Sequence, residues 1–258
     1  MKIKKLLALG LVGTMVFSMA ACGGSKDSDK GADKTGDVTV ETVLEAFDKY
    51  TDESDTGYSY DMIMSMKIEA EEMSVEMDSK QTIMAYDGVK YTKESTTTSM
   101  LGMDDESVTE TYLIKMEDGT VIEATKDADD DEWDVYETEI EEDDSESKLN
   151  VEELAKTAKI EKDGNNYLVT ATVNAEEMGL TEEGMMEGLE DTTVEVVITY
   201  NAKQKDITSI DVNMDKEIME ALFSALLGEV EVKELTIKVE NIKKSDKAIE
   251  IPSEIELD

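Results

Sequence analysis

The chain lacks the residues on which many enzymes depend. Its 258 residues include no histidine and no arginine, a single cysteine and a single proline. The absence of histidine and arginine excludes Ser-His-Asp and Cys-His triads, histidine metal sites and the bidentate guanidinium clamps that hold phosphate or carboxylate groups. A single cysteine also excludes a disulfide within the chain.

Basic charge is scarce as well. The sequence has 25 lysines and 64 acidic residues, which gives a formal net charge of −39. Nucleic-acid binding is therefore not expected, because neutralising phosphates requires a basic surface. No glycine-rich phosphate loop or nucleophile elbow occurs, and one tryptophan and nine tyrosines do not mark a sugar-binding cleft. We expect neither an enzyme nor a bound cofactor.

The first 22 residues have the organisation of an export signal. Lys2, Lys4 and Lys5 give a positive start, and residues 6–17 form an apolar stretch. This stretch is too short for a membrane-spanning helix, which needs about 20 residues. Small residues follow and end at Cys22. The arrangement resembles a bacterial lipoprotein signal, which is cut before the cysteine so that the sulfur carries a diacylglycerol. An ordinary signal peptide that leaves a free thiol is the alternative.

The rest of the chain divides into a tether and a folded domain. Residues 22–37 are small and polar, without periodicity, and predict a lipidated cysteine followed by a flexible tether. Once the signal peptide 1–21 is removed, we expect the lipid on Cys22 to hold the protein on the extracytoplasmic face of the cell membrane. Residues 38–258 are predicted to form a single domain, and two similar halves divided near 141–147 are the alternative.

Hydrophobic periodicity predicts the elements of this domain. From Thr39, apolar residues recur with the spacing of one helix face, and from Tyr58 to Ile68 they alternate as in a strand with one buried face. Alternation recurs along most of the remaining chain, with hairpin signals such as Asp87-Gly88. Further helices are predicted at 149–155, 175–190 and 218–227. We therefore expect an α+β fold with a large antiparallel sheet and three or four helices.

Several features of the layout occur together in one known family. They are a leading amphipathic helix, the strand start Tyr58-Ser59-Tyr60-Asp61-Met62, hairpins, an acidic loop running into Trp133, and the closing Ile249-Glu250-Ile251-Pro252. Over most of residues 38–256 this layout resembles the lipoproteins with a LolA/LppX-like fold that are common on monoderm bacteria. The resemblance implies a sheet curved into a half-barrel with the helices packed against its concave face. In the better-known members that face holds acyl chains.

Methionine is abundant, with 17 residues. Methionine side chains are flexible and polarisable, so they suit surfaces that adapt to variable apolar ligands. The predicted ligand-binding residues on the first two strands are Tyr60, Met62, Met64, Met66, Met73 and Met77. Two alternatives are that these methionines fill a core that is poor in aromatics, and that Met62, Met64 and Met66 bind Cu(I), which favours thioethers.

One acidic run has a spacing that resembles a metal site. Asp127, Asp129 and Asp131 have the spacing of a calcium loop, but Glu132 stands where the loop needs glycine, and Thr138 stands at the position of the bidentate glutamate. An EF-hand is therefore excluded, and weak binding of divalent cations by the acidic loops is the remaining metal hypothesis.

These observations lead to two hypotheses about function. The first is a membrane-anchored, non-enzymatic lipoprotein that binds a hydrophobic or amphiphilic, lipid-like ligand in a half-barrel groove. The second is a surface module for protein–protein interaction or envelope sensing, with a filled core and no small ligand.

Overall fold

The computed structural model describes residues 38–51, 57–70, 73–100, 102–116, 119–139, 151–174, 193–214, 216, 220, 230–245 and 247–255. The helices are α3 (Val40–Thr51) and α4 (Val151–Thr157). The strands are β1 (Gly57–Ala70), β2 (Met73–Tyr86), β3 (Val89–Met100), β4 (Met103–Lys115), β5 (Thr120–Asp127), β6 (Asp134–Glu139), β7 (Lys159–Asp163), β8 (Asn166–Asn174), β9 (Thr193–Asn201), β10 (Asp206–Met214) and β11 (Glu231–Ser245).

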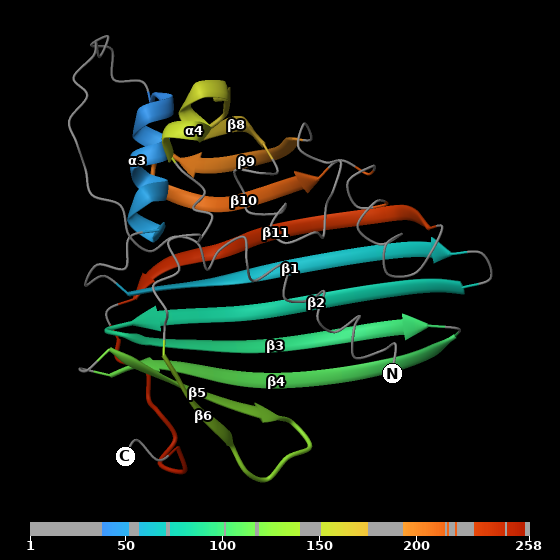
Figure 1. Cartoon of the computed structure of the whole chain (residues 1–258). Helices are drawn as coiled ribbons and strands as arrows, with labels where there is room; N and C mark the ends of the chain where they lie inside the picture. The colour runs from blue at the N-terminus through green and yellow to red at the C-terminus, as the bar shows by residue number, and fades with distance from the viewer. Residues whose placement is uncertain are drawn as a thin grey trace.

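All the described strands belong to one open antiparallel sheet. Its order is β6-β5-β4-β3-β2-β1-β11-β10-β9-β8-β7 (Figure 1). Strands that are neighbours in sequence are neighbours in the sheet, except that β6 and β7 lie at its two edges, and β1 pairs with β11 in the middle. Strand β11, near the end of the chain, pairs with β1 along almost its whole length. The sheet therefore joins the N-terminal and C-terminal halves of the described chain.

The expectation of an α+β half-barrel with three or four helices is wrong. The described chain is mostly antiparallel sheet, with 71% strand, 10% helix and two short helices. The physical reason is the length of the strands: β1 to β4 take 12–14 residues each and are joined by tight connections, so little chain is left for helices. The helices predicted near Thr39 and at 149–155 are confirmed as α3 and α4. The one predicted at 175–190 and most of the one at 218–227 lie outside the described residues.

Local sequence explains the central hairpins. In β1, apolar and polar residues alternate, so every second side chain lies on the same face. The turn between β2 and β3 is Asp87-Gly88, with φ angles of 50° and 75°. Both φ angles lie in the left-handed region, as a two-residue hairpin turn of type I′ requires. Asp-Gly is a favoured pair for this turn. The hairpin predicted from Asp87-Gly88 is confirmed.

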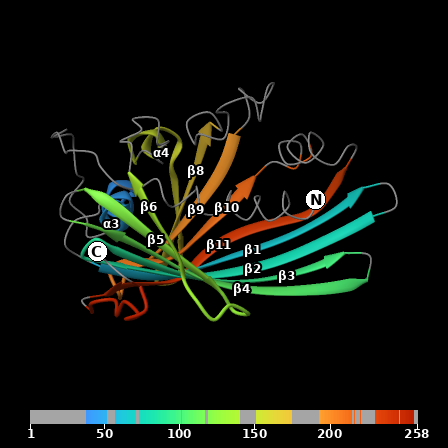
Figure 2. The same ribbon diagram turned by 60° about the horizontal axis from the view of Figure 1, so that its bottom comes forward.

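The sheet is curved, and its main core lies on the concave face. Figure 2 shows that β8, β9 and β10 rise on one side of the broad floor made by β1 to β4. Helix α3 packs against β10 and α4, and α4 packs against β8. Val43 and Phe47 of α3 and Leu154 of α4 belong to the same buried cluster as the apolar side chains of β1 and β8–β11. Both helices therefore cover the concave side.

A second, smaller core lies on the opposite face of the sheet. It contains Tyr112 and Ile114 of β4, Ile122 and Ala124 of β5, and Ile255 from the end of the described chain. Tyr112 also contacts the Trp133 ring, with centroids 5.3 Å apart. Apolar burial on this opposite face stabilises β4 and β5. Their residues on the concave face therefore do not need to be apolar.

Ion pairing on the convex face fixes how stability should depend on pH. The Asp61 carboxylate accepts hydrogen bonds from Thr82 Oγ1 at 2.8 Å and Asn241 Nδ2 at 2.9 Å, and pairs with Lys80 Nζ at 3.1 Å. Partial burial tends to raise the pKa of Asp61, but these three donors outweigh it, so the pKa lies below its usual value. Asp61 therefore stabilises the fold at neutral pH, and this contribution is lost only as pH falls below about 4.

We expect the thermal midpoint to hold or rise between pH 7 and pH 5 and to fall below pH 4. The paired Lys67, Lys233 and Lys238 have raised pKa values, so their contribution is lost only at alkaline pH. Meanwhile, partial protonation relieves the repulsion of a chain with net charge −39. Thermal melts across this range test the prediction, with Asp61→Asn expected to flatten the acid limb. A steep fall between pH 7 and pH 5 would contradict it.

Candidate functional site

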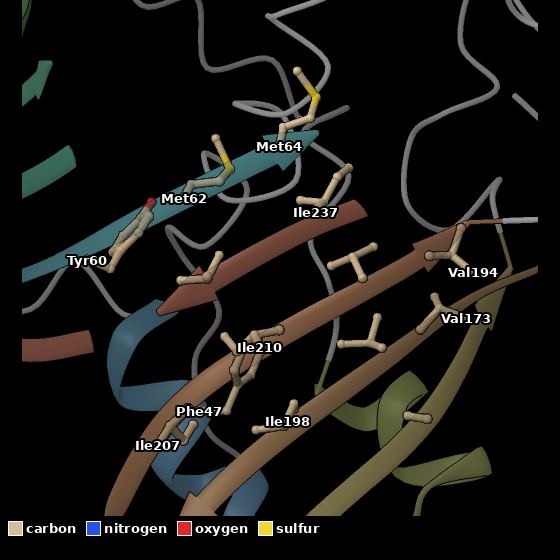
Figure 3. Close-up of a cluster of buried hydrophobic side chains, with 14 of the residues drawn as sticks. Phe47, Tyr60, Met62, Met64, Val173, Val194, Ile198, Ile207, Ile210 and Ile237 are labelled. Atoms are coloured by element: carbon tan, nitrogen blue, oxygen red, sulfur yellow. The ribbon is translucent and has the colours of Figure 1, made fainter. Parts of the chain in front are cut away.

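Four methionines of β1 and β2 form a buried row in the middle of the sheet and belong to the main hydrophobic core. Tyr60, Met62, Met64 and Met66 follow one another along β1 with exposed fractions of 8%, 3%, 7% and 4%. The three labelled side chains Tyr60, Met62 and Met64 extend to the same side of β1 (Figure 3). Met77 of β2, 5% exposed, stands directly opposite Met66 in the register. We call Met62, Met64, Met66 and Met77 the methionine row.

Apolar strands border the methionine row on the β11 side. Met62 pairs with Val239 and Met64 with Ile237, and these two pair in turn with Ile210 and Val212 of β10. All four of these neighbours are buried. The concave face from β1 to β8 is therefore continuously apolar.

Tyr60 marks one end of the row. Its ring stacks on that of Tyr58, with centroids 5.8 Å apart and an interplanar angle of 17°. Burial raises the pKa of the Tyr60 phenol above its usual value, and Tyr58 adds to the rise. Tyr60 is therefore a neutral, partly apolar platform rather than a source of charge.

Met73 and Cys22 complete the set of predicted site residues. Met73 pairs with Ala70 at the end of the β1–β2 hairpin, but its side chain lies outside the described residues, and so does Cys22. Segment 175–190, for which the sequence predicts a helix, is also outside them.

On its other side the methionine row meets a buried polar cluster that the hydrophobic periodicity of the sequence does not predict. Its members are Ser79 and Gln81 of β2, which stand opposite Met64 and Met62, and Thr96 and Glu94 of β3, which stand opposite Ser79 and Gln81. We call these four residues the polar cluster. Because residues that pair directly across an antiparallel sheet share a face, the polar cluster and the methionine row lie on the same concave face.

Hydrogen bonds tie three members of the polar cluster together. The Ser79 and Thr96 hydroxyls each donate to Glu94 Oε1 at 3.0 Å, and Thr96 Oγ1 lies 3.1 Å from Ser79 Oγ. Ser79 and Thr96 are 4% and 5% exposed, and Glu94 is half-buried. The fourth member differs: Gln81 is 2% exposed, and its Oε1 atom has no hydrogen-bond partner in the described structure.

The sequence contains a signal for this cluster. The alternation of Val75 and Met77 places residues 79 and 81 on the buried face, yet both are polar. A polar residue at a position whose phase predicts burial is an exception to binary patterning, and such exceptions mark functional or strained sites.

The acidic loop after β5 has a structural role within its described part. Lys126 Nζ donates to the Asp131 carbonyl oxygen at 3.0 Å and lies 5.9 Å from the centroid of the Trp133 ring. Among the residues that the structure describes, no group of three or more carboxylates is placed to hold a metal ion.

The chain matches no protein-family model and no curated protein. The function must therefore be inferred from the geometry of the concave face.

Proposed function

We propose that this protein is a non-enzymatic lipoprotein that binds a hydrophobic or amphiphilic ligand on the concave face of its sheet, over the methionine row. A lipid on Cys22 would anchor it to the extracytoplasmic face of the membrane.

The observation that carries the proposal is the composition of the concave face at the centre of the sheet. Four methionines from two adjacent strands stand together there, whereas β8 to β10, beneath the helices, present mainly valine and isoleucine. Branched side chains pack in fixed shapes, whereas unbranched thioethers adapt to a variable partner. The adaptable residues are thus concentrated beside the polar cluster, away from the strands against which α3 and α4 pack.

Binding can be tested with Nile red, an apolar dye that has no hydrogen-bond donor. Saturable fluorescence enhancement at one site per chain, reversed by an excess of decanol, supports the proposal. The absence of saturable binding would contradict it.

The anchor rests on the sequence signal, since Cys22 lies outside the described residues. No helix in the described part of the chain has the length and apolar character needed to cross a membrane. We expect Cys22→Ser to release the protein from the membrane fraction or to leave it as uncleaved precursor, because the thioether to the diacylglycerol cannot form. Fractionation and gel mobility measure both outcomes. A variant of processed size that stays membrane-bound would contradict the anchor.

One observation favours the second candidate, a protein-interaction module. Val135 and Tyr136 of edge strand β6 are 40% and 60% exposed. An edge strand with exposed apolar side chains can pair with a strand of another protein. The Nile red titration separates the candidates, because an interaction module with a filled core binds no dye on the concave face.

A further inference from the structure

The concave face changes from apolar to polar between two neighbouring strands. Met64 has Ile237 on one side and Ser79 on the other, and Met62 has Val239 on one side and Gln81 on the other. The boundary between the two chemistries therefore runs along β1 and β2, in the middle of the sheet. A ligand lying across this boundary needs an apolar part and a polar part.

The polar part of the concave face contains a hydrogen-bond acceptor without a donor. Gln81 is 2% exposed and its Oε1 has no partner among the described residues. A buried carbonyl oxygen without a donor is unfavourable, because it has lost its hydrogen bonds to water. A ligand that supplies an N–H or O–H group at this position removes part of that penalty.

The charge of the polar cluster determines which charge the head group of the ligand should carry. Glu94 stands opposite Gln81, and its Oε1 already accepts hydrogen bonds from Ser79 and Thr96. No lysine belongs to the cluster, and the chain contains no arginine. A carboxylate or phosphate head would meet an unpartnered acceptor and a negative charge, whereas an ammonium group would satisfy both.

We propose that the polar cluster, with Gln81 Oε1 and Glu94 at its centre, binds the hydrogen-bond-donating, cationic head group of an amphiphile, an alkyl ammonium, whose chain lies over the methionine row. This inference rests on the proposed function and specifies its ligand class. It excludes fatty acids and anionic phospholipids as preferred ligands.

The test is displacement of Nile red from the purified protein by three amphiphiles of equal chain length, each below its critical micelle concentration. Decylamine has a charged head with N–H donors, decyltrimethylammonium has the charge without the donors, and decanoate has the opposite charge. Because only decylamine can donate charge-assisted hydrogen bonds from its head group, it should displace the dye at concentrations about tenfold lower than decyltrimethylammonium, which corresponds to about 1.4 kcal/mol. Decanoate should be the weakest of the three.

Substitutions in the polar cluster test whether it causes the preference for a cationic, hydrogen-bond-donating head group. Gln81→Leu should reduce the advantage of decylamine over decyltrimethylammonium, because only the Glu94 carboxylate still accepts from the ammonium group. Glu94→Gln should reduce the advantage of both cations over decanoate. Glu106→Gln is the matched control, because it removes the same charge from an exposed position on the opposite face of the sheet, where Glu106 pairs with Thr97. It should change neither preference.

The outcomes separate this inference from the proposed function. Equal displacement by decylamine and decyltrimethylammonium in the wild type, or equal effects of Glu94→Gln and Glu106→Gln, would overturn the head-group assignment while dye binding still supports an apolar site. Failure of the wild type to bind Nile red would overturn both. If Gln81→Leu does not fold, Glu94→Gln and the wild-type ranking still decide the result.

Discussion

Replacing Ile198 with alanine is expected to lower the free energy of unfolding by about 2–5 kcal/mol. Ile198 is 0% exposed on β9 and belongs to the cluster that includes Phe47 and Leu154 of the two helices. The substitution removes three carbons from a closely packed interior, and the loss includes both their transfer free energy and the cavity that they leave. Denaturant unfolding measures the change.

The neighbouring valine provides the control. Val197 is half-buried and lies on the opposite face of the same strand, so Val197→Ala should cost less than half as much. Nile red affinity should be unchanged in folded Ile198→Ala, because β9 is separated from the methionine row by β10 and β11. Equal destabilisation by the two variants would contradict the position of the core on the concave face.

Replacing Met64 with lysine is expected to weaken Nile red binding by at least about tenfold, which corresponds to about 1.4 kcal/mol. Met64 stands at the centre of the methionine row, between Ile237 and Ser79. A lysine there lays a charged side chain across the surface that the apolar ligand would contact, and removing its ammonium group from water when the ligand binds is unfavourable. We expect the variant to stay folded, because the long stem of lysine can carry its charge past Ser79 toward Glu94.

Ser65→Lys is the matched control for this prediction. Ser65 is the next residue of β1, faces the opposite side of the sheet, and stands opposite Asp78, to which its hydroxyl donates at 2.6 Å. A lysine at this position adds the same charge beside an acidic neighbour, and dye affinity should be unchanged. An equal loss of binding in both variants would indicate a general effect of charge and contradict a site over the methionine row.

The local elements could be predicted from the sequence because their signals are local. The spacing of Val43, Leu44 and Phe47 predicts the first helix, and the alternation from Tyr60 to Ile68 predicts the buried face of β1. The overall class was predicted wrongly because periodicity does not show how long each strand continues. Strand β3, Val89–Met100, is rich in threonine and serine and has little apolar alternation, yet it forms a full strand between β2 and β4.

Long-range pairing explains why only part of the candidate site was predicted. The methionine row follows from alternation within β1 and β2, whereas its apolar neighbours Ile237 and Val239 are about 175 residues away and are brought there by β11. The polar cluster depends on the register of β2 against β3, which places Glu94 opposite Gln81. Periodicity indicates which face a residue occupies but not which residue of another strand stands beside it.

Methyl resonances of methionine offer the most direct test of the central claim that the concave face binds an amphiphile. In protein labelled with carbon-13 at the methionine methyl groups, a titration with decanol should produce saturable shifts at Met62, Met64, Met66 and Met77. Met103, which is 66% exposed at the hairpin between β3 and β4, is the internal control and should not move. Unchanged resonances throughout the methionine row at saturating decanol, or shifts confined to Met103, would contradict the account.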